Sequence, residues 1–347
     1  MREFVRTWLE RLKLLYLWFD RILFAPDHFH TPLHVRLALC LKGFVPDQYW
    51  LYDLKHRGTG EYLSEFDWYR SRRINGREAF VLNNKMVCTH LLHQYTDVPE
   101  ILCFRKGRPI VAANGDVLDE ASLLSLLRDA GRSFFKPTDS GKGKNILSIA
   151  REGEGFLVNG EPWQADRLVR RLFQEKNWLL CRFVEQSPFM ASFFPGSANT
   201  LRIITVRDAV YHRPEVLFAV QRFGRASTGP VDNASQGGLI AKVDLETGEL
   251  SEARTLWSKD SFVSHPDTGT PIRGAVIPDW QEIKARVTAL AAEFPYLDFI
   301  AWDILLTEQG MCVIEANASS GVTIIQLWGG QRHGELGEVY RRYGIIK

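Results

Sequence analysis

The sequence predicts an α+β protein with several lobes that share one site. Hydrophobic residues make up 45% and charged residues 24% of the 347 residues, as in an ordinary globular protein. Beyond residue 80, strand-like segments outnumber helical ones and alternate with them along the chain. No internal repeat or low-complexity linker interrupts this alternation. Together these observations favour α+β organisation.

The first 25 residues carry one apolar helical face. The apolar residues that recur there at steps of three and four are Val5, Trp8, Leu9, Leu12, Leu15, Tyr16, Phe19, Ile22 and Leu23. We expect this helix to pack on the rest of the protein. Because arginines and Lys13 accompany the apolar face, the alternative is a helix lying on an anionic membrane, a peripheral contact at the inner membrane face. No run of about 18 apolar residues is present, so no segment is expected to span a membrane.

Charge, cysteines and histidines narrow the class of protein. A formal net charge of +2 gives no support for nucleic-acid binding. The five cysteines are scattered without a Cys-x-x-Cys pair, which predicts reduced thiols in a cytoplasmic protein. His28, His30 and His34 lie close together, but no carboxylate or cysteine pattern completes a metal site. We therefore expect a structural or surface role for these histidines.

Periodicity places the remaining elements. Helices are expected over residues 85–95, 121–128, 164–176 and 280–293. Strands are expected over residues 101–104, 178–184, 201–206, 216–223, 239–243, 298–306 and 311–314.

The stretch FFKPTDSGKGKNILSIA, residues 134–150, places Gly141 and Gly143 among lysines. It is not a P-loop, which needs Gly-Lys-Ser/Thr at the start of a helix. A glycine loop between two strands can still fold over phosphates through backbone N–H groups and lysines. Lys136 shares a strand face with Phe134, which would place its ammonium group inside a cleft. The alternative is a solvated basic hairpin turn, and this stretch alone favours that alternative.

Two strand candidates near the C-terminus carry three oxygen-bearing side chains. Glu315 and Asn317 are two residues apart and share a strand face, while Asp303 lies on the preceding strand. Two carboxylates with an amide are ligands that suit Mg²⁺. The alternative is an ordinary hairpin with an exposed acidic pair. Because the neighbours of Asp303 are apolar, its strand is expected to be buried, and a metal or a basic partner is then required.

The turn between these strands sets their register. If residues 308–310 form a three-residue turn, Thr307 pairs with Met311 and Asp303 falls opposite Glu315. Gly310 would then occupy the left-handed position of that turn.

Six segments, taken in order, resemble the ATP-grasp ligases. They are NNKMVCTHLL, FFKPTDSGKGKNI, LLCRFVEQSP, NTLRIITV, AVQRFGRASTGPVDNASQGGLIAKVD and DILLTEQGMCVIEANASSG. Within that superfamily the chain is most similar to the sugar-transfer-associated ATP-grasp group, which resembles the α-L-glutamate ligases. The resemblance covers roughly residues 80–330. It implies two α+β lobes whose antiparallel sheets clasp ATP, with a mostly helical N-terminal region.

The resemblance also implies a division of the chain. An N-terminal region with the amphipathic helix would cover residues 1–79, and the first lobe with the glycine-rich loop residues 80–180. The second lobe, with the magnesium site, would cover residues 181–347.

Residue roles follow from the same resemblance. Lys85 and Lys136 are similar to the two family lysines that reach the ATP phosphates, and the loop of Ser140, Gly141, Lys142 and Gly143 would close over the β and γ phosphates. The segment after Cys181, with Arg182, Phe183, Val184 and Glu185, resembles the hinge strand that contacts adenine and ribose. Asp303, Glu315 and Asn317 match the Mg²⁺ ligands. Arg202 and Arg222 resemble arginines near the γ-phosphate and the acyl-phosphate oxygens, and Asn233 matches a flexible substrate loop.

The implied function is an ATP-dependent carboxylate–amine ligase that acts through an acyl phosphate. Its partners would be a small-molecule carboxylate and an amine, and the product could belong to a sugar or polysaccharide precursor. The alternatives are a kinase that uses the same nucleotide site on a hydroxyl group, and a nucleotide-binding adaptor of membrane glycan machinery. The metal ligands and both lysines argue against the adaptor, since an inactive site would not need them.

Overall fold

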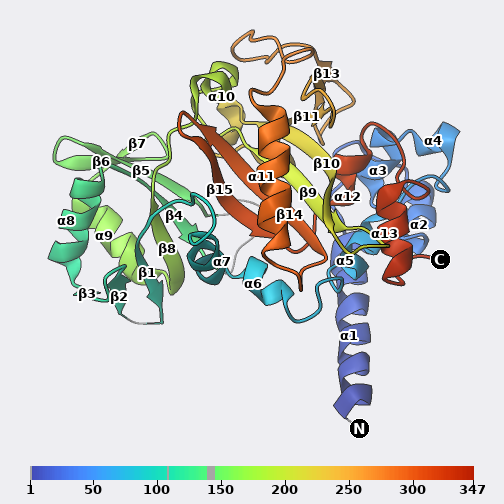
Figure 1. The fold of residues 1–347 in the computed structure, drawn as a ribbon, viewed down its shortest axis with the longest axis horizontal. Coiled ribbons are helices and arrows are strands. Elements are labelled where there is room, and N and C mark those ends of the chain that lie inside the picture. The colour runs from blue at the N-terminus through green and yellow to red at the C-terminus, as the bar shows by residue number, and fades with distance from the viewer. Residues whose placement is uncertain (1, 108, 139–144) are drawn as a thin grey trace.

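The computed structural model describes residues 2–107, 109–138 and 145–347. Figure 1 shows a first sheet beside a second, larger body, with an N-terminal helical region on the far side of that body. Every named strand pair in both sheets is antiparallel. The predicted α+β class with two antiparallel sheets is confirmed.

The first sheet has eight strands in the order β3-β2-β1-β8-β4-β5-β6-β7. Its strands are β1 (Ile101–Lys106), β2 (Ile110–Ala112), β3 (Val117–Leu118), β4 (Arg132–Pro137), β5 (Leu147–Glu152), β6 (Gly155–Val158), β7 (Glu161–Trp163) and β8 (Asn177–Arg182). Two amphipathic helices, α8 (Glu120–Ala130) and α9 (Ala165–Gln174), pack leucines against one face of this sheet. The opposite face carries Phe134 and Lys136, because alternate residues of a strand point to opposite sides.

The second sheet has seven strands in the order β13-β12-β11-β10-β9-β14-β15. Its strands are β9 (Leu201–Arg207), β10 (Pro214–Phe223), β11 (Leu239–Val243), β12 (Leu250–Arg254), β13 (Ser261–Phe262), β14 (Phe299–Thr307) and β15 (Gly310–Asn317). Short 3₁₀ turns, η2 (Ala226–Thr228) and η3 (Ala234–Gln236), lie between β10 and β11. The strands expected from the sequence agree to within a few residues with β9, β10, β11, β14 and β15.

Helices cover one face of the second sheet. They are α6 (Ala79–Asn83), α7 (Lys85–Leu92), α10 (Pro188–Phe193) and α11 (Trp280–Ala292). Leu82, Cys88 and Leu92 are buried in the core of the second sheet, so α6 and α7 pack on β15.

The N-terminal region covers the other face of the second sheet, together with the C-terminal helices. The elements are α2 (Leu33–Leu41), α3 (Pro46–Leu51), α4 (Leu54–Arg57), α5 (Glu65–Ser71), α12 (Val322–Gln326) and α13 (Glu335–Arg342). Leu63, Ile74 and Tyr340 share one buried core with strands β9, β10 and β14. The Asn75 amide accepts hydrogen bonds from the backbone N–H groups of Asp298 and Phe299 and donates to the Phe299 carbonyl, at 2.6–3.0 Å.

The first helix, α1 (Arg2–Trp18), continues as a π-helical turn, η1 (Phe19–Leu23), and projects from the body (Figure 1). Its C-terminal end is packed: Leu17 and Trp18 contact the small core that contains Ile22 and Cys40. The exposed apolar side chains of the projecting part are Trp8, Leu9, Leu12, Leu15, Tyr16 and Phe19, with exposed fractions of 41–65%. The prediction that this apolar face packs on the protein was wrong for these residues, because the helix buries the opposite side of its last turn.

The turn between β14 and β15 also differs from the prediction. Thr307 pairs with Gly310 and not with Met311, so Glu308 and Gln309 form a two-residue turn. A register shift between Asp303 and Ile304 inserts one extra residue on β15. Asp303 consequently pairs with Glu315, as expected, and Gly310 has a positive φ of 125°.

All five cysteines are free and buried. Burial raises the pKa of the Cys88, Cys103 and Cys312 thiols to about 12. Within the described parts of the chain, no helix has both the length and the apolar content needed to cross a bilayer.

Candidate active site

A cleft of about 360 Å³ opens between the two sheets. Strands β4 and β8 form one wall, and β9, β10, β14 and β15 form the other. The sequence-predicted residues that line it are Lys136, Arg182, Val184, Arg202, Arg222, Asn233, Asp303, Glu315 and Asn317. The fold thus brings together residues that are up to 181 positions apart in the sequence.

A row of charged side chains crosses the wall formed by the second sheet. Strand register places Asp303 between Arg202 on β9 and Glu315 on β15. Arg202 Nη2 donates to Asp303 Oδ2 at 2.8 Å, and Arg202 Nε contacts Oδ1. Ile204 and Ala301 lie on the same face of the sheet as Arg202 and Asp303, each two residues away along its strand, and are buried in the core. This face of the sheet is therefore apolar where it is buried and charged where it lines the cleft.

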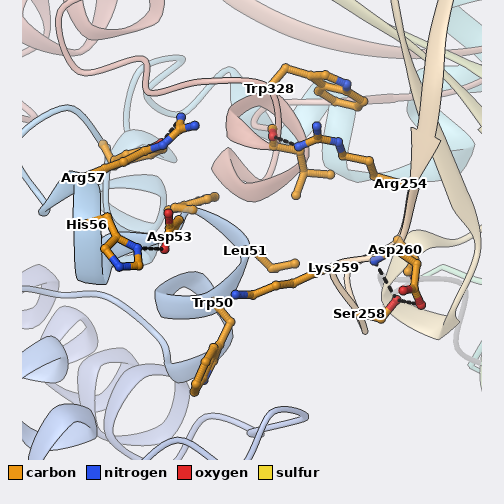
Figure 2. Close-up of a pocket in the computed structure, with 14 residues that line it drawn as sticks. Trp50, Leu51, Asp53, His56, Arg57, Arg254, Ser258, Lys259, Asp260 and Trp328 are labelled. Carbon is orange, nitrogen blue, oxygen red and sulfur yellow. Dashed lines mark hydrogen bonds and ion pairs between the residues drawn. The ribbon is translucent and has the colours of Figure 1, made fainter. Parts of the chain in front are cut away.

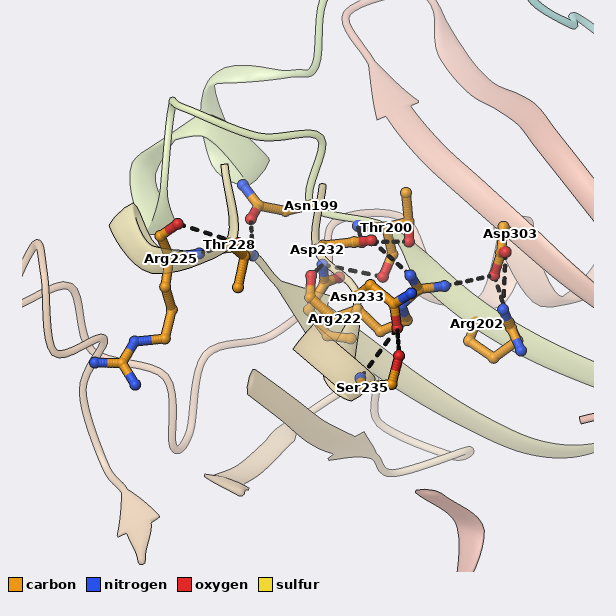
Figure 3. Close-up of polar contacts among 12 residues, drawn as sticks. Asn199, Thr200, Arg202, Arg222, Arg225, Thr228, Asp232, Asn233, Ser235 and Asp303 are labelled. Atoms are coloured by element: carbon orange, nitrogen blue, oxygen red, sulfur yellow. Dashed lines mark hydrogen bonds and ion pairs between the residues drawn. The ribbon is translucent and has the colours of Figure 1, made fainter. Parts of the chain in front are cut away.

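A second arginine reaches the same carboxylate. Arg222 Nη1 lies 3.1 Å from Asp303 Oδ1, and its Nη2 lies 2.6 Å from Asp232 Oδ1 (Figure 3). Asp232 also accepts hydrogen bonds from the Thr200 backbone N–H at 2.8 Å and from the Thr200 hydroxyl at 2.5 Å. Asp232 therefore fixes the orientation of the Arg222 guanidinium in the cleft wall.

This cluster is electrostatically balanced. Burial alone would raise the pKa of Asp303, but the charges of Arg202 and Arg222 hold that pKa below its usual range. Burial opposes the charged form of Arg222, yet Asp232 and Asp303 raise its pKa. The basic partners expected for Asp303 are thus its two neighbouring arginines.

Lys85 and Glu315 form the other end of the charged row. Lys85 begins α7, and its Nζ lies 3.0 Å from Glu315 Oε1. Lys85, Lys136 and Glu315 line one small space between the sheets. The two lysines predicted to reach the phosphates therefore converge on one corner, Lys85 from the second-sheet side and Lys136 from the first.

The first-sheet wall agrees with the period-two prediction. Phe134 and Lys136 line the cleft, whereas Phe135 is buried beneath α8 and α9. The predicted phosphate loop of Ser140, Gly141, Lys142 and Gly143 lies outside the described residues.

The segment proposed as the hinge is only partly in the cleft. Arg182 and Val184 line it, and Arg182 Nε lies 2.5 Å from Glu100 Oε2. Phe183 stacks on Phe134 with ring centroids 5.3 Å apart. Glu185 is not among the lining residues; it forms an ion pair with Arg132 and is exposed.

Asn233 opens the short η3 turn at the cleft edge. Its side-chain oxygen accepts a hydrogen bond from the Ser235 backbone N–H at 3.0 Å (Figure 3). Gly238 follows, and a Cβ atom there would lie 2.8 Å from the Asp232 carbonyl oxygen and 3.0 Å from that of Asn233. Only glycine fits this approach, so Gly238 holds the loop against β10 and β11.

Asp303, Glu315 and Asn317 all line the cleft. Because Asn317 is an amide, these three residues are not a group of three His, Cys, Asp or Glu side chains. In the described ranges, no such group suited to a metal occurs. The donor chemistry of the three residues nevertheless fits Mg²⁺, which takes carboxylate and amide oxygens and retains several waters. Asp303 Oδ1 accepts from both arginines, whereas Asp303 Oδ2 and Glu315 Oε1 each have a second lone pair beyond their one ion-pair contact.

Several cleft residues were missed from the sequence. Glu65 and Trp68 come from α5 in the N-terminal region, and the Trp68 indole N–H donates to Ser319 Oγ at 3.3 Å. Asp232 immediately precedes Asn233 in a motif that was recognised, but its pairing with Arg222 depends on the β10–β11 connection. Only the tertiary fold places α5 over the cleft.

Comparison with known protein families supports the resemblance to ATP-grasp proteins. Residues 67–335 match the family described as "Sugar-transfer associated ATP-grasp". Since this match covers most of the chain, the protein belongs to that family.

Other similarities are more distant. A Caenorhabditis elegans protein named mitochondrial GTPase Era is 30% identical over 132 residues, which are 34% of this chain and 32% of that protein. Among solved structures, the ADP complex of PurK, N5-carboxyaminoimidazole ribonucleotide synthetase, aligns with a TM-score of 0.40 and 13% identity over 69% of this chain and 45% of the other. The VanG D-Ala:D-Ser ligase of Enterococcus faecalis aligns with a TM-score of 0.40 and 13% identity over 71% and 55%. The chain therefore spans less than two thirds of each of these proteins.

Proposed function

We propose that this protein is an ATP-dependent carboxylate–amine ligase that acts through an acyl phosphate. The observation that carries this proposal is the convergence of Arg202 and Arg222 on Asp303 in the cleft between the sheets. The family match supports ATP as the nucleotide.

The nucleotide would bind between the two walls. Phe134, Val184, Leu305 and Ile314 give the cleft an apolar section that suits an adenine ring. Lys136 and Lys85 lie beyond it and would neutralise phosphate oxygens.

Asp303, Glu315 and Asn317 would hold Mg²⁺. When bound, the ion neutralises charge on the transferring phosphoryl group and orients it. Lys85, which contacts Glu315, would then be able to turn its ammonium group toward the phosphates.

The two arginines would act on the reacting groups. A carboxylate oxygen of the substrate attacks the γ-phosphorus, and ADP leaves with the electron pair of the broken P–O bond. The amine nitrogen then attacks the acyl carbon, phosphate leaves, and the nitrogen loses a proton. Guanidinium forks at Arg202 and Arg222 would stabilise the oxygens on which charge accumulates in both steps.

The substrates would be a small carboxylic acid and an amine. The family description associates these proteins with sugar transfer, so we propose that one substrate is part of a sugar or polysaccharide precursor. The action would take place in the cytoplasm.

We also propose that α1 contacts an anionic membrane surface. Its exposed apolar side chains share one side of the helix, and exposed Arg11 and Lys13 lie beside them. This contact would hold the cleft near membrane-linked acceptors at the inner face.

Hydroxylamine trapping tests the reaction. With ATP, Mg²⁺ and the correct acid, hydroxylamine in place of the amine should yield a hydroxamate, with ADP and free phosphate. A panel of amino acids and uronic acids supplies the candidate acids. A stably phosphorylated hydroxyl product without hydroxamate would establish a kinase instead, and nucleotide binding without turnover under any acid would favour the adaptor.

A further inference from the structure

A second cavity of about 500 Å³ lies away from the cleft (Figure 2). Its walls come from α3 and α4, from the segment that follows β12, and from the end of α12. It shares no lining residue with the cleft. Its size falls within the roughly 300–1,000 Å³ that is usual for small-molecule sites.

Three cationic side chains from three segments surround this cavity: Arg57, Arg254 and Lys259. Lys259 reaches across it and places Nζ 5.0 Å from the centroid of the Trp50 ring (Figure 2). The Arg254 guanidinium lies 5.8 Å from the Trp328 ring. Aromatic rings hold both cations at the cavity wall, and Arg254 also pairs with Glu252, its Nη2 3.3 Å from Glu252 Oε1. The cavity is thereby prepared for an anion.

The same walls carry groups that suit hydroxyls. Asp53, Ser258 and Asp260 supply oxygen acceptors, and the Trp50 and Trp328 indoles supply apolar ring surfaces. His56 Nδ1 lies 2.8 Å from Asp53 Oδ1, and this hydrogen bond holds the pKa of Asp53 below its usual range. Carboxylates beside aromatic rings can accept hydrogen bonds from several hydroxyls of one ring-shaped ligand.

The cavity is rigid on its inner side. Tyr52 and Tyr62 are buried and stack with ring centroids 4.6 Å apart. Arg254 Nη1 donates to the Leu327 carbonyl at 2.5 Å, and Arg57 Nη1 lies 3.4 Å from the Tyr62 hydroxyl. These contacts fix the cations before any ligand arrives, which lowers the ordering cost of binding.

We propose that this cavity binds a phosphorylated sugar, with Arg57, Arg254 and Lys259 around the phosphate and Asp53 and Asp260 accepting from the hydroxyls. This proposal does not depend on the ligase reaction. A buried hydrogen-bond link nevertheless connects the cavity to the cleft: the Gln48 amide nitrogen lies 3.4 Å from the hydroxyl of Tyr52, which lines the cavity, and 3.1–3.2 Å from Thr323 and Glu65, which line the cleft.

Calorimetric titration of the full chain tests the proposal. The probes are glucose 6-phosphate, glucose 1-phosphate and N-acetylglucosamine 1-phosphate, with glucose and inorganic phosphate as partial ligands. At least one sugar phosphate should bind saturably at one site, more tightly than either partial ligand, and saturating Mg-ADP in the cleft should not displace it. Lys259→Gln and Arg57→Gln should each weaken binding on the order of tenfold, because each removes a charge-assisted contact. Lys55→Gln, which removes an exposed charge of α4 outside the cavity, should bind as the wild type does.

Circular dichroism of each variant checks that the fold is retained. No saturable binding of any of the three sugar phosphates would overturn the proposal. So would displacement by ADP, equal binding by inorganic phosphate alone, or unchanged affinity in folded Lys259→Gln and Arg57→Gln variants.

Discussion

Asp303 is the residue on which the site depends most. It is buried, contacts two arginines, and faces Glu315 across the ladder. Asp303 and its neighbour Glu315 have different surroundings. Glu315 is partly exposed and pairs with Lys85, whereas the Asp303 side chain is buried. Substitutions at the two acids should therefore separate catalysis from stability.

Glu315→Gln should lower ATP turnover by at least about a hundredfold, because it removes one charge from the proposed Mg²⁺ shell. The thermal midpoint should change little, since the Glu315 side chain is 32% exposed and its amide replacement can still contact Lys85. Coupled ADP-release assays and thermal melts measure both. Near-normal activity in magnesium would remove Glu315 from the metal site.

Asp303→Asn should cost stability as well as activity. Removing the charge of Asp303 leaves Arg202 without its carboxylate partner and Arg222 with Asp232 alone, at a cost of about 3–5 kcal/mol. Since the folded pKa of Asp303 is depressed, its contribution is present above the unfolded pKa of about 3.9 and is lost as the pH falls below that value. Urea unfolding at pH 7 and pH 3.5 should show a smaller difference between wild type and variant at the acid pH. An equal difference at both would contradict this account.

At the scale of elements, strands were easier to predict than their register. The period-two rule correctly placed Phe134 and Lys136 in the cleft and Asp303 opposite Glu315. Asp303 lies opposite Glu315 although the turn is one residue shorter than predicted, because an unforeseen bulge adds one residue on β15 and restores the register. Bulges depend on side-chain packing across strands and are not visible in a local pattern. The same limit applies to Glu65 and Asp232, whose partners are set by the tertiary fold.

Helix α1 exposes the apolar side chains of Trp8, Leu12 and Leu15. The replacements Trp8→Ser, Leu12→Ser and Leu15→Ser should weaken binding to phosphatidylserine vesicles while leaving activity toward free substrates unchanged, because these side chains are exposed. Vesicle sedimentation at two salt concentrations measures this, and high salt should weaken the charge-driven part of wild-type binding.

The matched control is Val210→Ser with Tyr211→Ser, which removes exposed apolar surface elsewhere and should keep vesicle binding. A truncation of residues 1–25 would be a poorer test, since Ile22 belongs to a buried core. Equal sedimentation of wild type and triple variant would contradict the membrane proposal.

For the whole molecule, the important feature is that each sheet has its own core. The first sheet packs on α8 and α9, and the second sheet is covered on both faces by other elements. The cleft therefore lies between two separately stabilised bodies, and a ligand that contacts both walls links them.

A nonhydrolysable ATP analogue with Mg²⁺ should raise the thermal midpoint. At a hundredfold excess over its dissociation constant, the stabilisation is about 2.7 kcal/mol. Lys136→Ala, on the first-sheet wall, should abolish most of the shift without lowering the midpoint of the ligand-free protein, because Lys136 lies outside the core. Calorimetric scans with and without analogue measure this. A full shift in Lys136→Ala would place the nucleotide elsewhere.

The N-terminal region and the C-terminal segment are held together by direct hydrogen bonds. Gln48, Leu63 and Asn75 bond to Thr323, Gln326 and Phe299, and Arg73 Nη2 lies 2.6 Å from the Gly344 carbonyl oxygen. On a ribosome that adds roughly 5–20 residues per second, residues 48–75 must wait on the order of tens of seconds for these partners to be made. During that time Leu63 and Ile74, which end in the core of the second sheet, have no sheet surface to cover them. Residues 48–75 of the newborn chain should therefore need a chaperone until residues 299–344 have left the exit tunnel.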